Sequence, residues 1–228
     1  MARTSRGSSE GQVQVVAGPV TLHGSLSRPK SAHGVVLFAH GSGSSRHSSR
    51  NRYVARALHD AGLATLLIDL LTAEEEAVDA QTSHLRFDIG LLAERLVGAT
   101  NWLAGNPETA DSAIGYFGAS TGGGAALVAA AELPNVVGAV VSRGGRPDLA
   151  GPALPRVQAP TLLIVGGNDV PVIGLNRKAL EQLGAREKQL VIVPGATHLF
   201  EEAGALEEVA RLAADWFTRH LCAGPRGG

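Results

Sequence analysis

The chain has 228 residues, of which 44% are hydrophobic and 18% are charged, values close to those of globular proteins. This length suffices for one large domain with its own core, and we expect a single domain over residues 1–228. Twenty lysines and arginines stand against 21 aspartates and glutamates, a net charge of -1, so nothing favours a nucleic-acid partner.

The cysteine content and the N-terminal segment favour one cellular compartment. Cys222 is the only cysteine, which rules out an intramolecular disulfide and favours a reducing cytoplasm. Residues 1–14 lack the apolar core of a secretory signal, and the longest apolar runs fall short of the roughly 20 residues that cross a bilayer. We expect a cytoplasmic protein with no membrane partner, and frayed ends over about residues 1–11 and 223–228.

Short β-branched runs alternate with longer amphipathic stretches, a pattern typical of a mostly parallel sheet covered by helices on both faces. The first two runs, joined by Gly18-Pro19, predict an antiparallel hairpin at one edge of the sheet. The sequence therefore predicts an α/β fold with a sheet of about eight strands. These strands are Gln12–Ala17, Val20–Leu26, Val35–Ala39, Ala64–Ile68, Ala113–Phe117, Val136–Val141, Thr161–Val165 and Gln189–Val193.

Helices are predicted between the strands and at the C-terminal end. Ser48 or Ser49 is placed to cap the first helix, and Gly62 and Gly184 are placed to end two of them. Residues 69–83, which contain three consecutive glutamates, predict a solvated loop or short helix and not a metal site, because no His or Asp stands at ligand spacing. The predicted helices are Arg50–Ala61, Arg86–Ala104, Thr121–Glu132, Leu175–Leu183 and Leu206–His220.

The most informative motif is Gly118-x-Ser120-x-Gly122, which joins a predicted strand to a predicted helix. This context is typical of a nucleophile elbow, a strained turn that exposes a reactive serine. Small residues are needed on both sides of the serine because side chains there would collide with neighbouring backbone. By itself the motif is equally compatible with an ordinary tight turn in a glycine-rich chain, so other parts of a site must support it.

Asp169 and His198 supply those parts. Each follows a predicted strand near the carboxyl edge of the sheet, where ligands bind in α/β folds. The resulting order of Ser, Asp and His along the chain is the order found at a nucleophile elbow. Taken singly, Asp169 would be read as a turn residue and His198 as a surface residue, whereas three coincidences at three strand ends favour a catalytic triad.

The loop after the third predicted strand reads His40-Gly41-Ser42-Gly43. A tetrahedral oxyanion needs two N–H donors, and we expect them from Thr121 and Ser42, with Gly41 or Gly43 as alternatives to Ser42. His40 is expected to brace this loop. A phosphate-binding loop is disfavoured, because no Gly-Lys-Ser/Thr follows.

With these motifs the chain, from Val13 to about His220, resembles the α/β-hydrolase superfamily and, within it, the small dienelactone-hydrolase-related proteins without a cap domain. Dienelactone hydrolases proper use a cysteine nucleophile, whereas this chain has Ser120. Similar sequences also occur joined to phosphoribosyltransferases. The resemblance implies an eight-stranded sheet and a hydrolytic activity.

Two charged residues follow the sixth predicted strand. Arg143 is a candidate for binding a substrate carboxylate, the alternatives being a pair with Asp148 or Asp169, or exposure to solvent. Asp148 is also a second candidate for the catalytic acid. Asp169 is favoured because its excursion from an adjacent strand is shorter.

Together these features predict a carboxylic-ester hydrolase that acts on small esters through an acyl-enzyme and uses neither a cofactor nor a metal. An acyltransferase or a thioesterase with the same triad is an alternative. A hydrolase-like binding module that does not turn over substrate is another. The oligomeric state is not predicted.

Overall fold

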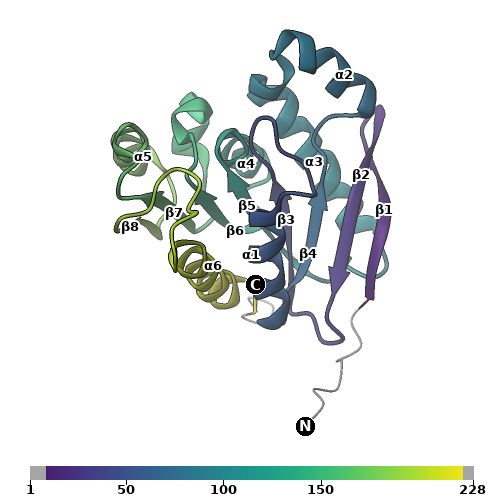
Figure 1. Ribbon diagram of the computed structural model, residues 1–228. Helices are drawn as coiled ribbons and strands as arrows, with labels where there is room; N and C mark the ends of the chain where they lie inside the picture. The colour runs from purple at the N-terminus through teal and green to yellow at the C-terminus, as the bar shows by residue number, and fades with distance from the viewer. Residues whose placement is uncertain (1–8, 223–228) are drawn as a thin grey trace.

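One sheet of eight strands forms the centre of this computed structural model, which describes residues 9–222 (Figure 1). The strands lie in the order β1-β2-β4-β3-β5-β6-β7-β8. β1 and β2 are antiparallel to their neighbours, and the remaining neighbours are parallel. Their bounds are β1 (Ser9–Ala17), β2 (Val20–Arg28), β3 (Gly34–Ala39), β4 (Ala64–Ile68), β5 (Ala113–Ala119), β6 (Val137–Arg143), β7 (Thr161–Gly166) and β8 (Lys188–Val193).

The predicted strands, the mostly parallel sheet and the edge hairpin are confirmed. In the hairpin, Gly18 has a φ of 62°, a conformation that glycine adopts without steric cost. β1 begins at Ser9, three residues before the predicted strand, and so includes residues 9–11 of the end predicted to be frayed. Residues 1–8 and 223–228 lie outside the described part of the chain.

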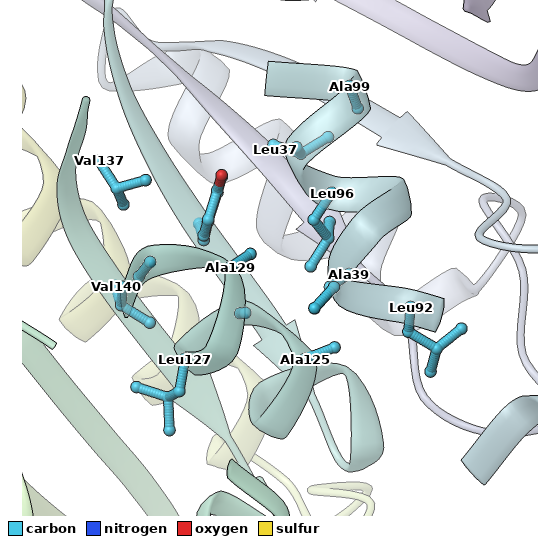
Figure 2. Close-up of a cluster of buried hydrophobic side chains, with 14 of the residues drawn as sticks. Leu37, Ala39, Leu92, Leu96, Ala99, Ala125, Leu127, Ala129, Val137 and Val140 are labelled. Carbon is cyan, nitrogen blue, oxygen red and sulfur yellow. The ribbon is translucent and has the colours of Figure 1, made fainter. Parts of the chain in front are cut away.

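Helices cover both faces of the sheet. One hydrophobic layer packs under α3, α4 and α5, and the other under α1 and α6. β3 contributes to both layers, because Leu37 and Ala39 face one while Val36 and Phe38 face the other. Figure 2 shows the first layer, with Leu37 and Ala39 beside Leu96 of α3. The helices are α1 (Ser49–Asp60), α2 (Ala73–Thr82), α3 (Ile89–Gly105), α4 (Thr121–Glu132), α5 (Val170–Gln182) and α6 (Ala205–Leu221).

Within residues 9–222 no helix is long and apolar enough to cross a membrane. Only a 3₁₀ helix, η2 (Pro147–Arg156), lies between β6 and β7, and no cap domain is inserted there.

Residues 69–83 contain a helix, one of the two predicted alternatives, and two further helices start at other residues than predicted. Residues 73–82 form the complete helix α2, because the Thr72 hydroxyl accepts from the Glu75 N–H and the Glu75 carboxylate accepts from the Thr72 N–H. α3 begins at Ile89 and not at Arg86, since the Asp88 carboxylate caps it by accepting from the Leu91 N–H.

Upstream of that cap, Leu85–Phe87 form a short 3₁₀ helix, η1. α5 starts at Val170, five residues before the predicted start at Leu175. Pro171 lies in its first turn, where the N–H that proline lacks would have no partner within the helix.

Two glycines predicted to end helices do so differently. Gly62 follows α1 with a φ of 85°, as a helix-ending glycine does. Gly184 follows α5 without a left-handed conformation. A Cβ there would lie 2.0 Å from the Pro155 carbonyl oxygen, so close packing against η2 requires a glycine.

Candidate active site

Ser120 stands between β5 and α4 in a strained conformation, with φ at 52° and ψ at −123°. Its N–H donates to the Arg143 carbonyl at 3.3 Å, and its own carbonyl accepts from the N–H groups of Gly123 and Arg146, both at 3.0 Å. These bonds fix the turn on both sides of the serine.

The glycines of the motif are required by close contacts. A Cβ on Gly118 would lie 2.6 Å from the Gly122 carbonyl oxygen, and a Cβ on Gly122 would lie 2.3 Å from the Ala39 carbonyl oxygen. Real Cβ atoms do not approach backbone so closely. The turn therefore packs directly on itself and on the end of β3, which is the geometry expected of a nucleophile elbow.

Asp169 and His198 face each other across neighbouring loops. Oδ2 of Asp169 lies 2.6 Å from Nδ1 of His198, and the two side chains are 12% and 39% exposed. The loops that carry them are tied together, since the Asn168 N–H donates to the Ala196 carbonyl at 2.9 Å and the Asn168 amide donates to the Gly195 carbonyl at 2.8 Å. The pair is held by both loops and not by one flexible segment.

β6 links this pair to Ser120. Ala119 pairs with Arg143 across the sheet, so Gly144 lies next to Ser120. A Cβ on Gly144 would come within 3.5 Å of Cε1 of His198. The imidazole edge between its two nitrogens therefore lies over the residue beside the serine.

The loop after β3 closes over the other side of Ser120. A Cβ on Gly41 would lie 3.0 Å from the Ser120 Cβ. The Ser42 N–H donates to the Thr121 hydroxyl oxygen at 3.0 Å, and the two hydroxyl oxygens are also 3.0 Å apart. The structure thus brings together the two residues predicted to supply the oxyanion donors. The Ser42 N–H, however, is bonded to the Thr121 hydroxyl oxygen and does not point freely at an oxyanion.

His40 braces this loop, as expected. Its Nε2 accepts from the Leu70 N–H at 3.1 Å, and its Nδ1 lies 3.0 Å from the Gly41 carbonyl oxygen, which assigns the proton to Nδ1. Burial lowers the pKa of His40, so the neutral ring joins the ends of β3 and β4.

Arg143 is only 6% exposed, and its guanidinium carbon lies 5.7 Å from the centre of the Phe200 ring. Burial, with a smaller effect of Arg50, lowers the pKa of Arg143 to about 10. The alternative of a solvent-facing arginine is therefore wrong.

Asp148 pairs with Arg146 through two hydrogen bonds of 2.9 and 2.7 Å, so the alternative of an Arg143–Asp148 pair is wrong as well. No ion pair joins Arg143 to Asp169 among the described residues. The predicted binding of a substrate carboxylate by Arg143 competes with a structural role against Phe200, and kinetics on neutral and anionic esters decide between the two.

A cavity of about 470 Å³ opens beside Ser42 and Thr121. Its far wall includes Glu76 and Asp79 of α2 and Arg86 of η1. From the sequence, Glu76 is expected only as one of three consecutive glutamates in a solvated loop or short helix, and neither Asp79 nor Arg86 is expected at a site. The capping pattern of Thr72 and Glu75 indicates the helix, but no sequence signal shows that the helix covers a cavity.

The strand order, the strained serine after β5 and the Asp–His pair after β7 and β8 define an α/β hydrolase fold. The chain belongs to the dienelactone hydrolase family, whose model matches residues 22–221. The family assignment therefore agrees with the fold.

Solved structures agree with this assignment. A dienelactone hydrolase from Anabaena variabilis is 67% identical, covering 94% of this chain and 99% of that one, with a TM-score of 0.92. Est1E from Butyrivibrio proteoclasticus has the same fold at 16% identity, covering 92% of this chain and 98% of that one, with a TM-score of 0.76.

A curated relative from Mycobacterium tuberculosis is named a putative phosphoribosyl transferase. It is 62% identical over 217 residues, which are 95% of this chain and 48% of the relative. The chain thus spans about half the length of that relative.

Proposed function

We propose that the protein is a serine hydrolase that cleaves small carboxylic esters through an acyl-enzyme, with Ser120, His198 and Asp169 as its triad. The observation that carries this proposal is the strained Ser120 together with the His198 imidazole, which lies over the neighbouring Gly144 and whose Nδ1 is 2.6 Å from the Asp169 carboxylate. This relation keeps Nε2 free to act as a base and orients the ring.

In the first half of the reaction, the Ser120 hydroxyl oxygen bonds to the ester carbonyl carbon while Nε2 of His198 takes its proton. The negative charge moves to the carbonyl oxygen, which accepts hydrogen bonds from the N–H groups of Thr121 and Ser42. The intermediate then expels the alcohol, which takes the proton from His198. Water repeats these steps on the acyl-enzyme and releases the acid.

The oxyanion donors require one rearrangement. Because the Ser42 N–H is bonded to the Thr121 hydroxyl before substrate binds, it changes partner when the oxyanion forms. The N-terminus of α4 adds the partial positive charge of its unpaired N–H groups at the same point.

An ester substrate is supported by the family and by the names of similar structures, which include Est1E and a cold-adapted esterase. The printed name phosphoribosyl transferase applies to a protein about twice as long as this chain. A cytoplasmic location is supported by the single cysteine of the sequence.

Hydrolysis of p-nitrophenyl acetate and labelling by a fluorophosphonate test the proposal. The wild type should do both, and Ser120→Ala should do neither. Ser112→Ala is the matched control, because Ser112 precedes the opposite end of the same strand β5 and should behave as wild type. Labelling of Ser120→Ala at the wild-type rate, or a wild type that is never labelled, would overturn the proposal, and the second result would favour a binding module.

A further inference from the structure

The cavity extends from Ser42 and Thr121, which lie next to the reacting centre, to α2, which lies beyond one end of the strands (Figure 1). At the inner end it is lined by Gly41, Ser42 and Thr121, and Gly41 packs against Ser120. A group attached to a carbonyl at Ser120 can therefore enter the cavity directly. Its size of about 470 Å³ exceeds what one methyl group fills.

The cavity wall combines polar and apolar residues. Ser44, Ser45 and Ser48 line it together with Leu70, Leu71 and Leu92. Hydroxyl groups both donate and accept hydrogen bonds, so this wall can bind an uncharged polar group.

Most charged groups at the cavity are already neutralised. The Arg86 side chain is bonded to the Asp79 carboxylate at 2.5 Å and to the Asp79 carbonyl at 3.0 Å. The buried His40 is held neutral, and His47 is the other histidine on the wall. Arg46, which lies behind this wall, is paired with Asp69.

Glu76 differs from these groups, because its carboxylate makes no ion pair and no hydrogen bond with any residue from 9 to 222, although its backbone N–H donates to the Thr72 carbonyl. Glu76 is exposed at the cavity, and its partial burial, followed by the neighbouring Asp69, raises its pKa, while Arg46, which is itself paired with Asp69, acts in the opposite direction. Arg143 does not line the cavity and cannot offset this charge there.

We propose that this cavity binds the part of the ester next to the reacting carbonyl, and that Glu76 makes it select polar groups that carry no negative charge. The inference rests on the proposed esterase function. A negative group in the cavity would face the Glu76 carboxylate with no free cation to compensate, whereas a neutral or cationic group would not be repelled.

Two matched ester series test this inference. In the first, p-nitrophenyl esters carry acyl chains of similar length that end in a carboxylate, a methyl or a trimethylammonium group. In the second, acetates carry the same three kinds of charge on the alcohol. The measured quantity is the ratio of kcat/KM for the anionic ester to that for the neutral ester, in the wild type and in Glu76→Gln.

We expect the wild type to disfavour the anionic ester in at least one series, and Glu76→Gln to raise the ratio about two- to fivefold, the size typical of a solvent-accessible charge pair. Glu74→Gln is the matched control, because Glu74 lies on the same helix, is exposed like Glu76 and carries the same charge, but is absent from the cavity wall.

An unchanged ratio in Glu76→Gln in both series, an equal change in Glu74→Gln, or a wild type that prefers the anionic ester would overturn the inference. None of these results affects the proposed esterase function. Only a wild type that cleaves no ester in either series would count against that function.

Discussion

Oδ2 of Asp169 lies 2.6 Å from Nδ1 of His198, although 29 residues separate them along the chain. The two residues follow β7 and β8, which pair in parallel, so their loops leave the same edge of the sheet side by side. Asp148, the other acid at this edge, is instead engaged with Arg146.

This relationship predicts different costs for two matched changes. Asp169→Asn should lower kcat on a short-chain ester by about 10³ to 10⁴, because the amide stabilises the wrong imidazole tautomer. Asp148→Asn should cost less than about tenfold, as a change away from the reacting atoms does. Steady-state kinetics with both variants shown to be folded measure this, and the reverse ranking would assign the catalytic acid to Asp148.

The elbow glycines predict a loss of stability together with a loss of activity. Gly122→Ala should lower the free energy of unfolding by about 1 to 3 kcal/mol and reduce turnover sharply, because its Cβ would lie 2.3 Å from the Ala39 carbonyl oxygen. Gly174→Ala is the control within α5, where a Cβ meets no atom within 4 Å, and it should be neutral or slightly stabilising. Thermal unfolding and turnover of an ester are measured for both variants. A Gly122→Ala variant as stable and as active as the wild type would refute the packing argument.

Arg143 predicts a loss that does not depend on substrate charge. Its guanidinium packs on Phe200, two residues beyond His198, so Arg143→Ala should lower the turnover of neutral and anionic esters by the same factor. Kinetics on the two ester classes check this. A much larger loss on anionic esters would show that Arg143 binds a substrate carboxylate.

His40 predicts a dependence of stability on pH. Because burial lowers its pKa in the folded protein, the unfolded chain binds a proton more readily below about pH 6.5. The His40 contribution is therefore fully present above that pH and is lost as the pH falls, by up to about 1.4 kcal/mol per pH unit.

Urea unfolding at pH 7.5 and pH 5 measures this change in the wild type and in His40→Gln. The variant should be less stable at both pH values and lose less stability between them. An equal loss in both proteins would exclude His40 as the source.

The sequence predicts the elbow well, because Gly118 and Gly122 are demanded by backbone contacts that admit no Cβ. It also predicts that Asp169 and His198 lie at one edge, since successive parallel strands end there. It does not predict the contact between Ser42 and Thr121 side chains, which depends on how two loops 79 residues apart pack.

The sequence pattern also does not predict the burial of Arg143 or the residue at which α5 starts. A charged residue at a strand end normally reaches solvent, and only the Phe200 ring placed over it explains its burial. α5 begins ahead of the predicted start at Leu175, and Pro171 lies in its first turn, where the missing N–H is tolerated.

The central claim is that Ser120 is acylated during turnover. Mass spectrometry of the peptide that contains Ser120, after a rapid acid quench of the enzyme with p-nitrophenyl acetate, tests this most directly. We predict one acetyl group on Ser120 in the wild type, and a larger trapped fraction if deacylation is slowed. Continued hydrolysis with no acetyl group on Ser120, or with the acetyl group on another residue, would contradict the account.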